Sequence, residues 1–315
     1  MSAWPTSPEW LRSWWAEIPP HSYALLRIAL GASGVLALVG LTPFELYWPL
    51  DGLTPVVTAS SSWPKQWLVS HGLGTAAGWA LYLSLWVVFV AMTIGAFSEL
   101  AVLGAFVGQV LIAHWNNTPL SAAHQVETVL VFCLLWAPTG RVWSVDQWWR
   151  RKRGKPSLPD RAPAWPLMLM RCQVALIYLG SGLHKLAFPV WRDGSAVYWS
   201  LALNDFHRIP WTIPPSAVPF LAILAWGTLF FELLFPVLVF FRRTRMATLI
   251  AGIGLHLGLW ATLELGPFSW LMMASYIAFV DPERLSKVSP SSDKRSGTPQ
   301  LATLPRATTD TSDTM

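Results

Sequence analysis

Long apolar stretches separated by short polar connections dominate this chain. A helix needs about 20 apolar residues to cross the hydrocarbon core of a bilayer, and eight stretches approach that length. They are residues 22–41, 75–97, 99–115, 123–138, 166–188, 217–241, 246–262 and 267–280. Because backbone polar groups must be paired inside lipid, we expect each stretch to be helical. The pattern predicts an all-α, polytopic membrane helix bundle of about eight spans, with six as the lower limit.

Composition agrees with a membrane protein and argues against an ordinary soluble enzyme. Of the 315 residues, 53% are hydrophobic and only 12% are charged, whereas soluble domains carry about 25% charged residues. The chain contains 21 tryptophans, a residue that favours the membrane–water interface. The two cysteines, Cys133 and Cys172, both lie in apolar stretches and form no metal-binding motif. We therefore expect no metal site.

Positive charge is concentrated in two connections. Residues 141–161 contain seven Lys or Arg and two Asp residues, which accounts for the net charge of +5, and Arg242, Arg243 and Arg245 form a second cluster. With eight crossings both clusters and both termini fall on one side, which the positive-inside rule assigns to the cytoplasm. We therefore predict a multi-pass protein of the cell membrane with cytoplasmic termini, and no nucleic-acid partner.

The ends of the chain differ from its centre. Trp10, Leu11, Trp14 and Trp15 have the spacing of an amphipathic helix, so residues 1–21 are expected to lie along the inner interface. The first apolar stretch lacks a cleavage pattern and is expected to be a retained span. Residues 22–283 form the predicted transmembrane domain. Residues 284–315 are rich in Ser, Thr, Pro and Asp and predict a disordered cytoplasmic tail.

Ionisable residues inside the apolar stretches need a partner or a role, because each costs about 2.5–3.5 kcal/mol at mid-span on an insertion scale. The intramembrane charges singled out are Arg27, Glu127, Arg171 and Glu232. A purely structural interpretation pairs Glu232 with Arg27 or Arg171.

The fifth stretch carries a polar stripe. Arg171, Tyr178 and Lys185 follow one another at intervals of seven residues, and Gly182 leaves room beside the lysine. Arg171 and Lys185 can simply extend to the interfaces. Alternatively, Lys185 is desolvated and its neutral amine serves as a base.

Four blocks of the sequence resemble, in order, the vitamin K-dependent gamma-glutamyl carboxylase-like family, also called the horizontally transferred transmembrane (HTTM) domain. The blocks are Trp115-Asn116-Asn117, Trp143-Ser144-Val145-Asp146, IYLGSGLHKL at 177–186, and the segment 244–283 with His256 and Phe268-Ser269-Trp270. The likeness covers roughly residues 115–283. It departs at Arg141, where the animal carboxylase has a histidine, so that residue's role does not carry over.

The resemblance implies that Lys185 is a catalytic lysine whose neutral amine deprotonates a quinol on the non-cytoplasmic side. In the family the quinol then reacts with O2 and removes a carbon-bound proton from glutamate, which captures CO2. The implied cofactor is reduced vitamin K or another lipid quinol. The candidates for the pocket around it are Trp115, Asn116, Asn117, Tyr178, His184 and His256.

The leading hypothesis is therefore a quinol-dependent, carboxylase-like membrane enzyme, with membrane quinone and a peptide or protein substrate as partners. Two alternatives from other classes stay open. One is a transporter, or an export or maturation factor for a small secreted peptide. The other is a non-catalytic membrane scaffold, in which the same charges only hold helices together.

Overall fold

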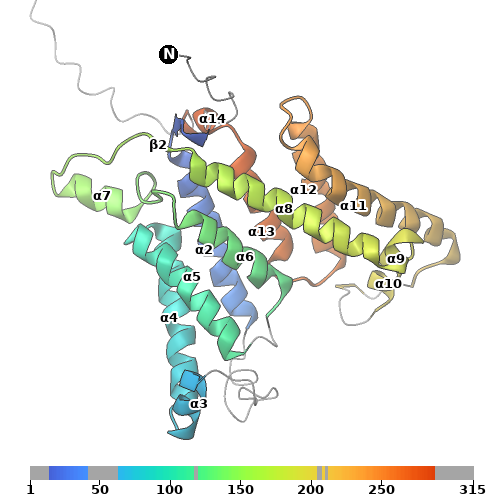
Figure 1. Ribbon diagram of the computed structural model, residues 1–315, viewed down its shortest axis with the longest axis horizontal. Helices are drawn as coiled ribbons and strands as arrows, with labels where there is room; N and C mark the ends of the chain where they lie inside the picture. Colours follow the sequence, from blue (N-terminus) through green and yellow to red (C-terminus); the bar gives the residue numbers. More distant parts are fainter. Residues whose placement is uncertain (1–13, 42–62, 117–119, 204–207, 210–211, 288–315) are drawn as a thin grey trace, which may run out of the picture.

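A computed structural model describes residues 14–41, 63–116, 120–203, 208–209 and 212–287, and within them nearly all regular structure is helical (Figure 1). The principal helices are α2 His21–Gly40, α4 Gly74–Ile94, α5 Ser98–Trp115, α6 Ala122–Leu134, α8 Trp165–Ala187, α11 Val218–Leu238, α12 Arg245–Thr262 and α13 Phe268–Ser275. The shorter elements are β1 Glu17–Ile18, α3 Trp63–Ser70, α7 Val145–Lys152, β2 Ala162–Pro163, α9 Pro189–Arg192, α10 Ala196–Ala202, η2 Pro215–Ala217, η3 Tyr276–Phe279 and α14 Pro282–Ser286. The predicted all-α class is confirmed.

Each of the eight predicted stretches overlaps one of these principal helices, and each helix begins within one residue of its stretch. In the described part of the chain, five helical segments are long and apolar enough to span a membrane: His21–Gly40, Gly74–Ile94, Ser98–Trp115, Trp165–Ala187 and Pro215–Leu238. Helix α6 and the α13–η3 segment are shorter apolar helices. At 1.5 Å per residue, the 13 residues of α6 extend about 20 Å, less than the roughly 30 Å hydrocarbon core.

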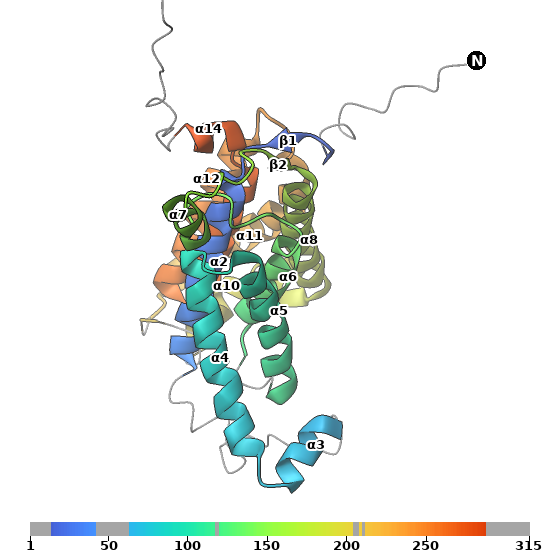
Figure 2. The ribbon, with the colours of Figure 1, turned by 90° about the vertical axis from the view of Figure 1, so that its left-hand side faces the viewer.

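The connections between the helices lie at two opposite ends of the bundle. At one end, β1 pairs antiparallel with β2, and Arg161 forms an ion pair with Glu283 of α14. The α11–α12 turn lies at this same end, as Figures 1 and 2 both show. Both basic connections thus lie together with the two ends of the described chain, as an even number of passes requires. That this end is cytoplasmic stays a prediction.

The opposite end carries α3, α9 and α10 (Figure 1). The backbone N–H of Arg208 donates to the carbonyl of Thr262, and the Arg208 side chain pairs with Glu264. These contacts connect the segment after α10 to the turn after α12.

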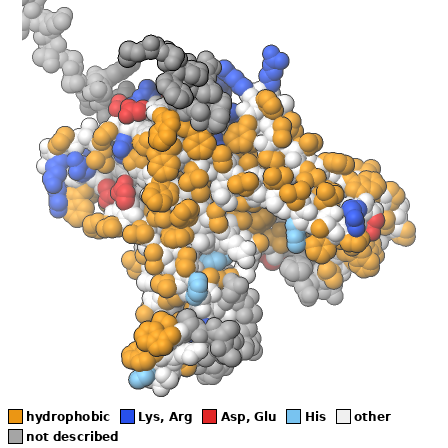
Figure 3. All heavy atoms as spheres, in the orientation of Figure 1, with side chains coloured by type: hydrophobic (Ala, Val, Ile, Leu, Met, Phe, Trp, Pro, Cys, Tyr) orange, Lys and Arg blue, Asp and Glu red, His pale blue; other side chains and the backbone are white. Residues whose placement is uncertain are grey.

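The core and the outer surface are both apolar. Helix α2 packs against α4, α6 and α13, while α8 packs against α6 and α11, and Leu26, Leu30 and Leu130 are fully buried among them. Large apolar side chains also cover the outside (Figure 3); examples are Leu36, Val87, Leu100, Ile223, Phe230 and Ile250. An apolar surface of this extent would be unfavourable in water and suits contact with lipid.

The predicted terminal segments lie largely outside the described residues. The interfacial segment 1–21 is described only from residue 14, and the tail 284–315 only to residue 287.

Candidate functional site

Lys185 lies near the end of α8, where this helix packs against α11. Its Nζ donates to both carboxylate oxygens of Glu232 on α11, at 2.6 and 2.8 Å, and to the hydroxyl of Ser181 at 2.8 Å. The ammonium also lies 5.0 Å from the ring centroid of Trp191, within the range of cation–π attraction. A carboxylate, a hydroxyl and an aromatic face therefore surround one cation.

Gly182 allows the close approach of the two helices. A Cβ at this position would lie 3.0 Å from Leu233 and 3.2 Å from Glu232, so a larger residue would push α11 away. The exposed fraction is 20% for the Lys185 side chain and 10% for that of Glu232. Lys185 thus does not extend to an interface; it is held in a largely buried ion pair.

A cavity of about 200 Å³, which we call the Lys185 cavity, opens beside this pair. Its apolar lining comes from Ile177, Trp191, Leu255, Leu259, Leu263, Leu265, Phe268 and Met272, and its polar lining from Tyr178, Ser181, Lys185, Ser200, Thr228, Glu232 and His256. The residues come from α8, α9, α10, α11, α12, α13 and the turn before α13.

A chain of hydrogen bonds lies along one wall of the Lys185 cavity. The hydroxyl of Tyr178 is 2.6 Å from Nε2 of His256 and also bonds the hydroxyl of Tyr276. All three residues are buried, and Nδ1 of His256 has no hydrogen-bond partner among the described residues. The wall therefore combines groups that can donate or accept a proton with one free ring nitrogen.

The structure brings together only part of the predicted site. Tyr178, Lys185 and His256 line one cavity, and Glu232, predicted only as an intramembrane charge, joins them. His184 is exposed and contacts Phe188, because one residue along a helix rotates the side chain by about 100°. His184 does not line the cavity.

Two other pocket candidates lie at the end of α5. Trp115 and Asn116 are buried, and the Lys65 ammonium on α3 bonds the carbonyl of Trp115. Neither residue lines the Lys185 cavity. Burial lowers the pKa of Lys65. Asn117 lies outside the described residues.

The remaining intramembrane charges have separate environments. Arg171 lies on α8 toward the basic end, where its Nε donates to the carbonyl of Ala278 at 2.6 Å. Arg27 on α2 donates to the Ser98 hydroxyl at 3.1 Å and to the Trp143 carbonyl at 2.6 Å. The predicted pairing of Glu232 with Arg27 or Arg171 is therefore wrong, because Lys185 is its partner. Glu127 lines a different cavity, described below.

The Trp143–Asp146 block connects the start of α7 to the start of α5. The Asp146 carboxylate accepts the backbone N–H groups of Phe97 at 2.8 Å and Ser98 at 2.7 Å, at the start of α5, together with the Ser98 hydroxyl. Ser144 caps α7 by accepting the N–H of Gln147. The block thus positions helices rather than lining the Lys185 cavity.

Sequence reasoning missed Ser181, Trp191 and Tyr276 as members of the site. Ser181 lies four residues before Lys185, so helical spacing alone could have identified it. Tyr276 is 98 residues from Tyr178, and nothing local to either residue indicates that they meet. Within the described residues no group of three or more His, Cys, Asp or Glu side chains could hold a metal ion.

This arrangement can move one proton without changing its net charge. The Lys185–Glu232 pair holds one proton, either as ammonium and carboxylate or as amine and carboxylic acid. In a weakly polar interior, desolvation of the two charges opposes the Coulomb attraction between them. The ammonium–carboxylate form is therefore less strongly favoured over the amine–carboxylic acid form there than it is in water.

Together, the fold and the site define a polytopic helical membrane protein with a buried Lys–Glu pair beside an apolar cavity. Residues 55–283 match the HTTM domain, which is more than half of the chain. The chain therefore belongs to the HTTM domain family.

Two curated proteins of Bacillus subtilis (strain 168) are similar to it. The uncharacterized protein YitO is 27% identical over 290 residues, covering 85% of this chain and 88% of that protein. The sporulation-delaying protein SdpB is 24% identical over 170 residues, which is 52% of each chain. No solved structure matches.

Proposed function

We propose that this HTTM protein is a membrane enzyme that binds a lipid quinol in the Lys185 cavity and uses Lys185 as a base. The observation that carries the proposal is the Lys185–Glu232 pair at the wall of an apolar cavity inside the membrane domain. An ion pair needed only for packing would gain nothing from a cavity beside it.

Glu232 gives Lys185 a route to its neutral form. When Nζ of Lys185 passes one proton to Oε1 or Oε2 of Glu232, an amine and a carboxylic acid remain. The amine can then take a proton from a hydroxyl group held in the cavity. Ser181 keeps Nζ in place through this exchange, because its hydroxyl can accept from the ammonium or donate to the amine.

The residues of the cavity fit a quinol. Leucine, methionine and aromatic side chains suit the ring and its apolar tail, while Lys185 and the free Nδ1 of His256 are hydrogen-bonding partners for hydroxyl groups. When bound, a quinol would supply reducing equivalents for reaction with O2. Tyr178, which also bonds Tyr276, would orient His256 through its hydrogen bond to Nε2.

The test is quinol-dependent oxygen uptake by the purified protein in proteoliposomes, with reduced vitamin K as the probe. A positioned base contributes about 10²–10⁴-fold to a rate, so Lys185→Ala should lower uptake by at least 100-fold. His184→Ala changes the neighbouring exposed side chain and should leave uptake unchanged. Equal uptake by wild type and Lys185→Ala would exclude the lysine as base.

A scaffold role is the second candidate, and the bidentate Lys185–Glu232 contact favours it, since such a pair also holds α8 against α11. Lys185→Arg separates the two functions. Arginine keeps the positive charge but does not release its proton in a protein. A scaffold therefore tolerates Lys185→Arg, whereas the enzyme loses uptake while its thermal unfolding midpoint stays near that of wild type.

A further inference from the structure

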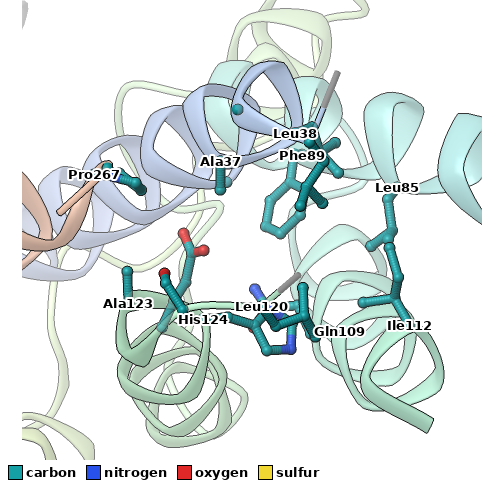
Figure 4. Close-up of a pocket in the computed structure, with 16 residues that line it drawn as sticks. Ala37, Leu38, Leu85, Phe89, Gln109, Ile112, Leu120, Ala123, His124 and Pro267 are labelled. Atoms are coloured by element: carbon teal, nitrogen blue, oxygen red, sulfur yellow. The ribbon is translucent and has the colours of Figure 1, made fainter. Parts of the chain in front are cut away.

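A second cavity, of about 170 Å³, lies among α2, α4, α5 and α6 on the other side of the turn before α13; we call it the Glu127 cavity. Its walls are mainly apolar, with Leu38, Leu85, Phe89 and Ile112 among them (Figure 4). Gly34 leaves space for the Phe89 ring, which a Cβ at position 34 would strike. The turn at 265–268 separates the two cavities: Leu265 and Phe268 line the Lys185 cavity, while Gly266 and Pro267 line the Glu127 cavity.

Four polar side chains line the Glu127 cavity, those of Gln109, Ser121, His124 and Glu127, and all of them except Ser121 have a buried atom without a partner among the described residues. Glu127 is 2% exposed and Gln109 is 1% exposed. Oε1 of Glu127, Nε2 of Gln109 and Nε2 of His124 have no hydrogen-bond partner among the described residues, and Figure 4 shows Gln109 and His124 close together at the cavity. Buried polar atoms are nearly always paired, so three free ones around one cavity indicate a ligand that supplies their partners.

The charge of Glu127 sharpens this indication. The Ser33 hydroxyl faces its carboxyl, but no ion pair within the described residues includes Glu127. Lys65 is bonded to the carbonyl of Trp115, and Arg27 is bonded to Ser98 and Trp143. A carboxyl group buried in a weakly polar interior without a counter-charge keeps its proton, and it ionises only when a cation lies beside it. A cationic ligand is therefore the partner that would let Glu127 act as a carboxylate.

We propose that the Glu127 cavity binds a small organic ammonium ion, a primary amine on a short apolar chain. The cavity offers what surrounds the ammonium of Lys185: a carboxylate, neutral acceptors and an aromatic ring. Glu127 supplies the carboxylate and Phe89 supplies the ring. The neutral acceptors are Nε2 of His124 and the amide oxygen of Gln109, once the Gln109 amide group has rotated by a half-turn. Leu38, Leu85 and Ile112 suit the carbon chain and cannot replace the water around a metal ion.

The experiment measures binding of n-butylammonium to the purified protein in detergent, by isothermal titration and by the thermal midpoint of tryptophan fluorescence. 1-Butanol has the same shape without the charge, and KCl supplies a monovalent cation without the chain. The wild type should bind n-butylammonium and raise its midpoint, with no comparable effect of the other two. Glu127→Gln should weaken binding at least tenfold, and Glu232→Gln, which alters the other cavity, should not.

Infrared spectra give a second readout that does not require a folded variant. Adding n-butylammonium to the wild type should remove the carbonyl band of a protonated carboxyl, since the ammonium ion brings the counter-charge and Glu127 releases its proton to the buffer. Equal binding of 1-butanol, an equal response to KCl, or binding lost in Glu232→Gln but kept in Glu127→Gln would each overturn the proposal. None of these results depends on the quinol chemistry of Lys185.

Discussion

At the scale of single residues, the partner of each buried charge separates structural roles from chemical ones. Arg27 and Arg171 donate to backbone carbonyls near the basic end of the bundle, and neither forms an ion pair within the described residues. Lys185 instead meets a carboxylate in the interior. Of these three cations, only Lys185 is bonded, in the part of the chain that the structure describes, to a side chain that can accept its proton.

The Lys185–Glu232 pair should show strong non-additivity in stability. Removing one partner of a buried pair leaves an uncompensated charge and is destabilising by about 3–5 kcal/mol, whereas replacing both with apolar residues is often nearly neutral. We therefore expect Lys185→Met to lower the free energy of unfolding more than the double variant Lys185→Met/Glu232→Leu. Chemical denaturation in detergent checks this order, and a double variant that is the less stable would contradict it.

The candidate site was predictable where helical spacing decides the outcome. The seven-residue interval placed Arg171, Tyr178 and Lys185 on one stripe of α8, and of these Tyr178 and Lys185 line the Lys185 cavity. The choice of Lys185 as the partner of Glu232 required the packing of α8 on α11, which no local pattern contains. His184 illustrates the same limit, because adjacency to the lysine in sequence places it on a different face of the helix.

At the scale of elements, charged side chains hold the corner between α4 and α5. Gly95 ends α4 with φ of 71°, and Asp146 holds the first N–H groups of α5. Arg27 completes the corner through Ser98. This corner gives the Trp143–Asp146 block a structural role at the basic end of the bundle.

Gly95→Ala should disrupt this corner. A left-handed backbone conformation costs a non-glycine residue about 1–2 kcal/mol, and the new Cβ would strike the guanidinium of Arg27, adding an overpacking penalty of about 1–3 kcal/mol. We expect a lower thermal midpoint measured by tryptophan fluorescence. Gly154→Ala is the matched control. Gly154 also has a positive φ, of 66°, but no atom lies within 4 Å of the new Cβ. Equal losses in both variants would show that the Arg27 contact contributes nothing.

Hydropathy predicted where the helices lie better than where they end. The stretch 123–138 becomes α6, which ends at Leu134, because the chain must turn toward the corner at Gly140. The stretch 217–241 becomes α11, which ends at Leu238 before the basic turn. An apolar residue in a membrane protein can belong equally to a helix or to a buried turn, so hydropathy alone cannot mark these boundaries.

At the scale of the whole molecule, the two ends of the bundle differ in charge, and this difference predicts its orientation. In a background of Cys133→Ser/Cys172→Ser, a cysteine at Gly154 should react with an impermeant maleimide only from the cytoplasmic side. A cysteine at Gly72 should react only from outside. Labelling of both positions from one side would contradict the three passes, α4, α5 and α6, that separate them, and exchanged sides would reverse the assigned orientation.

The turn at residues 265–268 ties the two cavities together mechanically. Leu265 and Phe268 line the Lys185 cavity, and Gly266 and Pro267 between them line the Glu127 cavity, so a shift of this short segment toward one cavity is a shift away from the other. A compound bound beside Pro267 would therefore change the shape of the Lys185 cavity without contacting Lys185. The effect of a substitution at residues 265–268 should therefore be measured on ligand binding in both the Lys185 cavity and the Glu127 cavity, because this turn lines both.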